Sequence, residues 1–306
     1  MAEVSITAMQ VLIMVMLLAV GAVCYKIKLI GDEAVKSLSN IALYISTSAI
    51  IIESCQTDFN KELLLNIVLV AALAALAHIL GIIIATLFFK KGRAGAELFR
   101  FASVFGNCGF MGIPLLAAIL PENGALFASI YMTIFNVFTW TYGIVLFSGK
   151  TEKGFIKKIL LSPVLISVAV GIVLFVFSIK LPTPIASTIS YLSDLNTPLA
   201  MMVTGALIAK SNLFSAFKSL STYKVLFLKL ILTSFVMNLI MRFLPFIPSE
   251  VQTAVVVLAA TPVASNTAMF ADKFEKDGKR AGELVVVSTV LSIISIPLMV
   301  YLGGLI

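Results

Sequence analysis

Residues Phe105–Leu116 read F-G-N-C-G-F-M-G-I-P-L-L and lie in the middle of a segment that is otherwise apolar enough to cross a membrane. Gly106, Gly109 and Gly112 each cost a helix about 1 kcal/mol relative to alanine, and Pro114 lacks the backbone N–H that a helix interior uses. We therefore expect the helical hydrogen bonds to be interrupted here. Open backbone in a bilayer is tolerated only inside protein or beside a watery cavity, so this stretch is a candidate binding site.

The composition of the whole chain is that of a membrane protein. Hydrophobic residues make up 60% of the 306 positions and charged residues 12%, and the mean hydropathy is +1.09. Apolar segments of about 20 residues, enough to cross about 30 Å of hydrocarbon, predict an all-α polytopic protein with ten transmembrane helices. The expected spans are 5–24, 36–54, 63–89, 98–120, 125–148, 158–178, 189–210, 222–246, 250–271 and 283–304.

The basic residues are concentrated on one side of these spans. Of the 22 Lys and Arg residues, 19 fall in odd-numbered connections and only Lys61, Lys180 and Arg242 in even ones. The odd connections carry Lys26, Lys28 and Lys36; Lys90, Lys91, Arg93 and Arg100; Lys150, Lys153, Lys157 and Lys158; Lys210, Lys218, Lys224 and Lys229; and Lys273, Lys276, Lys279 and Arg280. The positive-inside rule then predicts cytoplasmic odd connections, with both termini extracytoplasmic in the cell membrane.

The net charge of +7 is therefore explained by basic residues on one side of the lipid bilayer, which is the expected partner of the protein. No nucleic-acid partner is expected. Lys224 and Lys229 are expected to extend their ammonium groups to the inner membrane surface.

Interruptions recur at matching places in the two halves of the chain. The ninth span contains A-A-T-P-V-A-S-N-T-A at 259–268, about half a chain length after the first break. Ser46-Thr47-Ser48 in the second span and Asn196-Thr197-Pro198 in the seventh are separated by a similar offset. Because each half holds an odd number of spans, we expect 1–150 and 151–306 to be inverted five-helix repeats.

Two broken helices that cross near the membrane midplane would bring their free backbone ends together. The positive ends of the half-helices would face an anionic group, with neutral hydrogen bonds from Asn107, Ser265, Asn266 and Thr267. A single break is equally consistent with a packing kink, because glycine and proline are common in membrane helices. Two breaks in matching positions favour a site.

The chain resembles the auxin efflux carrier family, whose bacterial members are similar to malate and malonate permeases and share a broad fold with bile acid symporters. The resemblance rests on G-N-C-G-F-M-G-I-P-L at 106–115, T-P-L-A-M-M-V-T-G at 197–205, P-V-A-S-N-T-A-M-F-A-D-K-F at 262–274 and S-T-V-L-S-I-I-S-I-P-L at 288–298. At these positions Asn107, Pro114 and Pro262 match the asparagine and prolines of the family's crossover. Ser48 is a departure, since many relatives have proline there.

The resemblance implies a scaffold of residues 5–54 and 158–210 and a mobile transport domain of residues 63–148 and 222–304, which work as an elevator around the crossed fourth and ninth helices. It further implies a secondary transporter of small organic anions, mono- or dicarboxylates that are auxin-like or malate-like, with possible homodimers through the scaffold. A sodium-coupled organic anion symporter and a non-transporting membrane sensor are the alternatives.

The candidate substrate-binding residues come from the breaks and their polar partners. They are Ser46, Ser48, Asn107, Gly109, Gly112, Pro114, Asn136, Pro262, Ser265, Asn266 and Thr267, with Tyr131 and Trp140 as weaker candidates. The sequence shows no nucleophile with a base, no metal-ligand cluster and no cofactor motif, so we predict neither an enzyme nor a bound metal or cofactor.

Ion coupling has one candidate residue. No carboxylate is expected near the middle of a span, which argues against a strong sodium site. His78 is the single histidine and lies about halfway through the third span, so a role in proton coupling is one hypothesis. A neutral imidazole that packs and hydrogen-bonds among helices is the other.

Overall fold

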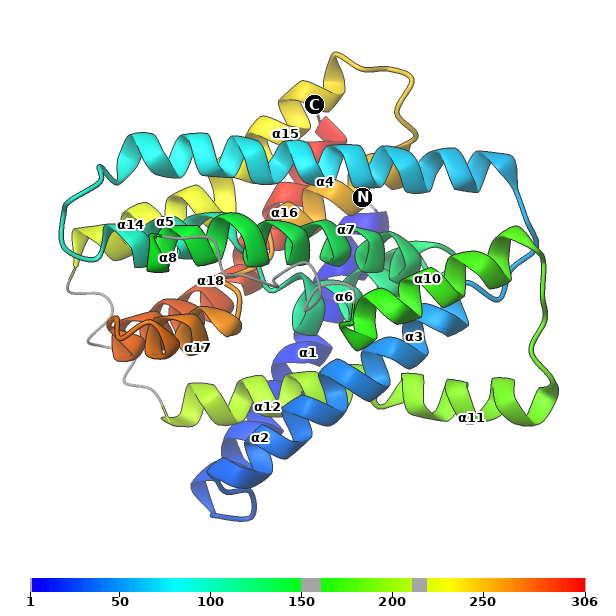
Figure 1. Cartoon of the computed structure of the whole chain (residues 1–306), viewed down its shortest axis with the longest axis horizontal. Coiled ribbons are helices and arrows are strands. Elements are labelled where there is room, and N and C mark those ends of the chain that lie inside the picture. The colour runs from blue at the N-terminus through cyan, green and yellow to red at the C-terminus, as the bar shows by residue number, and fades with distance from the viewer. Residues whose placement is uncertain (1, 150–160, 211–218, 306) are drawn as a thin grey trace.

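The computed structural model describes residues 2–149, 161–210 and 219–305, whose regular structure is helical apart from one β-bridge (Figure 1). The first half contains α1 (Ala2–Lys26), α2 (Asp32–Asn40), the π-helical turn η1 (Ile41–Ser46), α3 (Thr47–Ser54), α4 (Lys61–Phe88), α5 (Ala96–Val104), η2 (Cys108–Gly112), α6 (Ile113–Ile119), α7 (Gly124–Phe138), η3 (Thr139–Gly143) and α8 (Ile144–Ser148). The second half contains α10 (Pro163–Val176), α11 (Thr183–Asp194), α12 (Asn196–Lys210), α14 (Leu220–Phe227), η4 (Leu228–Leu232), α15 (Thr233–Arg242), α16 (Ser249–Ala259), α17 (Asn266–Lys273) and α18 (Gly278–Leu305).

The helices coincide with the predicted spans. Within the described ranges six continuous helical segments are long and apolar enough to cross a membrane: Asp32–Ser54, Lys61–Phe88, Gly124–Ser148, Thr183–Lys210, Leu220–Arg242 and Gly278–Gly303. Four shorter apolar helices, at Leu12–Lys26, Cys108–Ile119, Pro163–Val176 and Ser249–Ala259, fall in the other four predicted spans. The chain is therefore a multi-pass membrane protein. The count of ten spans stays a prediction, and the start of the predicted sixth span lies outside the described residues.

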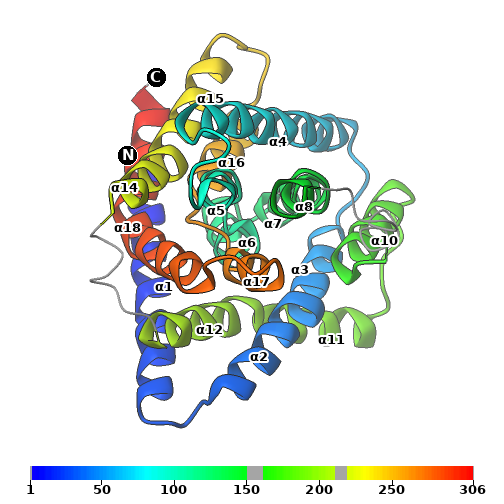
Figure 2. The same ribbon diagram turned by 60° about the vertical axis from the view of Figure 1, so that its left-hand side comes forward.

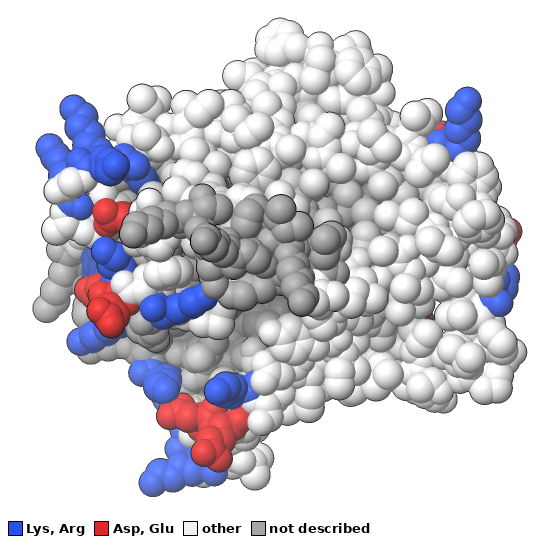
Figure 3. Space-filling view, in the orientation of Figure 1, with Lys and Arg blue, Asp and Glu red and all other residues white. Residues whose placement is uncertain are grey.

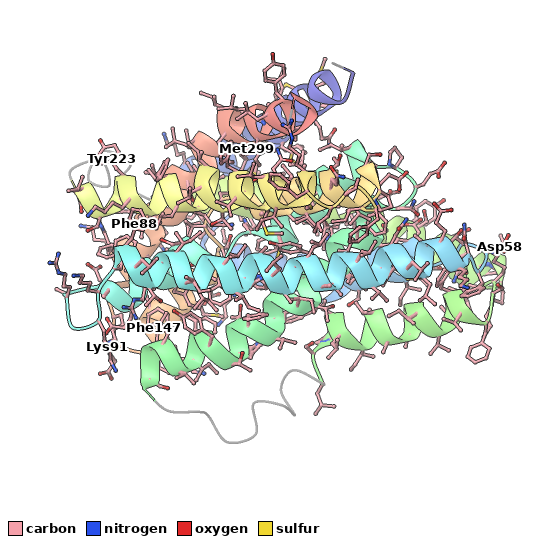
Figure 4. The ribbon with its side chains drawn as sticks, turned by 90° about the horizontal axis from the view of Figure 1, so that it is seen from above. Asp58, Phe88, Lys91, Phe147, Tyr223 and Met299 are labelled. Atoms are coloured by element: carbon pink, nitrogen blue, oxygen red, sulfur yellow. The ribbon has the colours of Figure 1, made fainter. Side chains whose placement is uncertain are left out.

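On the face that Figure 3 shows, the charged side chains of the described residues gather toward the two ends of the long axis, and the described surface between them is largely uncharged. Asp58 precedes α4 and Lys91 follows it, and the two lie at opposite ends of that helix (Figure 4). This arrangement agrees with the predicted separation of odd and even connections. Lys150, Lys153, Lys157, Lys158 and Lys218 belong to that prediction but lie outside the described residues.

The helices of residues 2–54 and 163–210 pack against one another. In α1 and α12 this contact is so close that a Cβ on Gly21 would collide with the carbonyl oxygen of Met202, and one on Gly205 with that of Leu18. The helix α3 packs against α10 and α11. In Figure 2 these helices border the group formed by α4–α8 and α14–α17. The scaffold and the transport domain predicted from the sequence lie on the two sides of this boundary, and that division stays a proposal.

A buried hydrogen bond joins the polar interruptions of the second and seventh predicted spans. The side-chain Nδ2 of Asn196 donates to Oγ1 of Thr47 at 2.9 Å, and the Thr47 hydroxyl donates to the carbonyl oxygen of Ala42 at 2.9 Å. The oxygens Ser46 Oγ, Ser48 Oγ and Asn196 Oδ1 are buried without a partner among the described residues. The two segments that the sequence pairs by their offset thus meet in space.

The close crossing of α1 and α12 predicts a stability difference between two glycines. Gly205→Ala should lower the free energy of unfolding by about 1–3 kcal/mol, because the new methyl group overlaps the α1 backbone. Gly282→Ala is the matched control in α18, where a Cβ meets nothing within 4 Å. That change should be neutral or stabilise the protein by up to about 1 kcal/mol. Thermal unfolding in detergent measures both, and equal melting temperatures for the two variants would contradict the packing argument.

Candidate substrate site at the helix crossover

The two interrupted segments form the crossover by pairing with each other. Residues 105–107 separate α5 from η2, residues 260–265 separate α16 from α17, and Gly106 and Val263 form an antiparallel bridge. The backbone N–H of Asn107 donates to the carbonyl oxygen of Pro262 at 2.7 Å, and that of Ala264 donates to Phe105 at 3.0 Å. Each break therefore satisfies backbone groups of the other, which is the condition for open backbone inside a membrane protein.

The breaks are shorter than the sequence predicts, and the first one does not extend to Pro114. The first helix resumes at Cys108 and continues to Ile119, with Pro114 just after the π-helical turn η2. Gly112 is a contact residue, because a Cβ there would lie 2.7 Å from Leu258 on α16. The second helix resumes at Asn266, so of the polar residues from Ser265 to Thr267 only Ser265 lies in the break.

A cavity of about 420 Å³ opens beside the crossover. Its described walls are Leu43 and Tyr44 of η1; Gly106, Asn107, Gly109 and Phe110; Met132, Phe135, Asn136 and Trp140 of α7 and η3; Leu161, Ser162, Pro163 and Val164 at the start of α10; and Ala264, Ser265, Asn266, Met269 and Phe270. These walls belong to both groups of helices. None of these described residues is acidic or basic, so the described lining carries no formal charge.

The predicted site residues divide into those that line the cavity and those that do not. Asn107, Gly109, Asn136, Ser265 and Asn266 line it, and Asn107 Nδ2 donates to Ser265 Oγ at 3.2 Å. Gly112, Pro114, Pro262 and Thr267 are buried but do not line the cavity, and neither do Ser46 and Ser48. The weaker candidate Trp140 lines it, whereas Tyr131 packs against His78. Sequence reasoning missed the apolar walls, because buried apolar residues look alike whether they line a cavity or fill a core.

The first turn of α17 has unsatisfied polar atoms at this site. Asn266 Oδ1 and Thr267 Oγ1 are buried and have no partner among the described residues. Buried polar atoms are nearly always hydrogen-bonded, so Asn266 Oδ1, on a residue that lines the cavity, calls for a ligand or water, whereas Thr267 does not line the cavity. The starts of η2 and α17 both reach the cavity through Asn107, Gly109 and Asn266. Helix starts carry partial positive charge, so two of them act here on one small volume.

Comparison with known proteins shows the family of the chain. A family model described as "Membrane transport protein" matches residues 4–157 and 151–300. The chain belongs to this membrane transport protein family. It is 24% identical over 299 residues to an uncharacterized transporter of Methanocaldococcus jannaschii, covering 94% of this chain and 96% of the relative. It is also 26% identical over 227 residues to a "Putative malonate transporter" of Rhizobium meliloti, covering 71% of this chain and 70% of the relative.

One charged residue of this transporter lies where the sequence did not place it. Lys229, on η4, is 2% exposed, and its Nζ donates to the carbonyl oxygen of Ala259, the last residue of α16, at 2.8 Å. The expectation that it reaches the membrane surface is therefore wrong. Without it, 18 of the 22 basic residues remain on the predicted cytoplasmic side. One signal in the sequence indicated that Lys229 is buried: it lies roughly 10 Å from the start of the predicted eighth span.

His78 lies among aromatic rings rather than at the cavity. Its Nδ1 donates to the carbonyl oxygen of Ala74, one turn earlier in α4, at 2.7 Å, and the side chain is buried. The ring centroids of Phe105, Tyr131, Phe135 and Phe138 lie 5.2–6.1 Å from that of the imidazole. These contacts favour the packing hypothesis over proton coupling, because the described hydrogen bond of the imidazole runs to the backbone of its own helix and its described neighbours are aromatic rings.

We expect His78→Gln to leave the pH dependence of transport unchanged. Loss of ring packing should lower the free energy of unfolding by about 1–3 kcal/mol, which is the usual range for a buried substitution. The pH dependence is measured as initial uptake rates in proteoliposomes between about pH 5.5 and 8, where an unperturbed histidine titrates. A folded variant whose uptake no longer responds to pH would show that His78 couples transport to protons.

Proposed function

We propose that the protein is a secondary transporter of small organic anions, with mono- or dicarboxylates as substrates and the crossover cavity as their binding site. The observation that carries the proposal is the meeting of two helix starts, η2 and α17, at one cavity whose described lining residues include no carboxylate. The partial positive charge of the helix starts would be balanced by the negative charge of the substrate.

The walls suit the chemistry of such a substrate. Asn107, Asn136, Ser265 and Asn266 offer neutral hydrogen-bonding groups for carboxylate oxygens, while the methionine and aromatic walls suit a short hydrocarbon part. A volume of about 420 Å³ lies within the usual range of small-molecule sites and has room for a short mono- or dicarboxylate. Malonate is the first compound to test, since a relative that covers most of this chain is named for it.

Alternating access is the proposed mechanism. The proposed scaffold (5–54 and 158–210) contributes η1 and the start of α10 to the cavity, and the proposed transport domain (63–148 and 222–304) contributes the remaining walls. Movement of one group of helices along the other would open the cavity first to one side of the membrane and then to the other. Ten helices in two inverted halves, an elevator motion, location in the cell membrane with both termini outside and association of two copies through the scaffold belong to the same proposal.

Binding and uptake of carboxylates test this function. Malonate and related mono- and dicarboxylates should raise the melting temperature of the purified protein, because a ligand that binds the folded state stabilises it. Radiolabelled malonate should then enter proteoliposomes with saturable kinetics. Ligands that bind but do not cross the bilayer would indicate a sensor, and the absence of binding by any carboxylate would refute the anion site.

Asn107 provides the sharpest test of the site. Asn107→Ala removes a side chain that lines the cavity and holds Ser265, so we expect uptake to fall by roughly 10- to 100-fold, as for the loss of a hydrogen bond to a charged group. Asn238→Ala is the matched control, since Asn238 is equally buried on α15 but does not line this cavity. If a folded Asn107→Ala variant takes up substrate at the parental rate, the crossover is not the substrate-binding site.

A further inference from the structure

Lys229 is a buried cation without a described acidic partner. The other charged side chain that is almost fully buried in the described ranges, Glu283, pairs with Arg280 at 3.0 Å. The one hydrogen bond of the Lys229 ammonium runs to the backbone at Ala259. A charge removed from water without a counter-charge costs several kcal/mol, so its position at the crossover needs an explanation.

The end of α16 explains part of the burial of the Lys229 ammonium. The last carbonyl groups of this helix accept hydrogen bonds from side chains: Val256 from Ser234 at 2.9 Å, Leu258 from Thr261 at 2.7 Å and Ala259 from Lys229 at 2.8 Å. A helix end carries partial negative charge, equivalent to about half an electron. When Lys229 is protonated its ammonium carries a full positive charge, so part of that charge would be left uncompensated.

The cavity lies directly across the backbone of Gly106 from this ammonium. Gly106 lines the cavity, and a Cβ built on it would lie only 2.7 Å from Lys229 Nζ and would collide with Thr261 Oγ1. No side chain of Gly106 stands between the two, and Lys229 itself does not line the cavity. An anion in the cavity would therefore lie close to Lys229 without touching it.

We infer that Lys229 is the fixed counter-cation of the substrate, a specificity-determining residue that acts across the Gly106 backbone. The inference rests on the proposed function, because it needs an anion in the cavity, and it adds the residue that selects for charge. Affinity should rise with each negative charge on a substrate of constant shape. In a protein interior with an effective dielectric constant of about 20, two charges about 8 Å apart change an equilibrium by roughly 30-fold.

The competing explanation is that Lys229 only caps α16. A cap would affect stability but would not make binding depend on the charge of the ligand. The two explanations are separated by a series of ligands that differ in charge and little in shape: malonate with two negative charges, malonamate with one and malonamide with none. Chloride, nitrate and phosphate extend the series beyond carboxylates.

The test compares Lys229→Gln with the parent by calorimetry and thermal shift. Glutamine can still donate to Ala259, so the cap can survive while the charge is removed. We expect the preference for malonate over malonamate to fall by roughly tenfold or more. Lys224→Gln is the matched control, the same change five residues earlier on the same helical span. Lys224 is only partly buried, so this change should leave the preference unchanged. Lys229→Arg keeps the charge and should retain the preference even if its larger head group weakens binding overall.

Each result bears on the inference. A folded Lys229→Gln protein with the parental preference would show that Lys229 is a cap only, and anion transport would stand. If that variant does not fold, loss of the preference in Lys229→Arg, or its absence in the parent, overturns the inference.

If no anion of the series stabilises the parent, the inference and the proposed anion site both fail. If the parent binds inorganic anions but no carboxylate, the proposed substrate class fails and the role of Lys229 is tested with phosphate and chloride.

Discussion

The pairing of two interrupted helices is the interaction on which the rest of the structure depends. The bonds from Asn107 to Pro262 and from Ala264 to Phe105 give partners to backbone groups that neither segment could satisfy alone. An unsatisfied peptide group in an apolar environment costs several kcal/mol, so neither break is tolerable without the other. The same pairing brings the starts of η2 and α17 to one cavity and places the end of α16 beside Lys229.

The charges of this arrangement follow from helix direction. Helix starts reach the cavity, where partial positive charge favours an anion, and a helix end meets Lys229, where partial negative charge favours a cation. The hydrogen bond between Asn196 and Thr47 is a second junction, made between the other pair of polar interruptions. The cavity has walls from both groups of helices, so relative motion of the groups would change access to the cavity while each junction stays inside its own group.

Much of the fold could be predicted because hydropathy and membrane thickness determine it. The segment 63–89 was expected and Lys61–Phe88 is helical, and similar agreement holds for the other described spans. The limits of the breaks were less accessible, because a glycine or proline shows that a helix is weak without showing where it resumes. Pro114 illustrates this, since the helix that resumes at Cys108 runs through this proline to Ile119. Lys229 was misplaced because a lysine normally indicates the end of a span.

Gly106 connects these observations. A side chain there would displace Thr261 and Lys229 and would disturb the bridge to Val263, so the pairing and the position of the ammonium require the same glycine. Glycine is destabilising in a helix, but at this point the chain is not a helix, and the absence of a side chain leaves only backbone between a cation and the cavity. The weakness of the segment as a helix is therefore what would allow a buried charge to act on an anion in the cavity without contacting it.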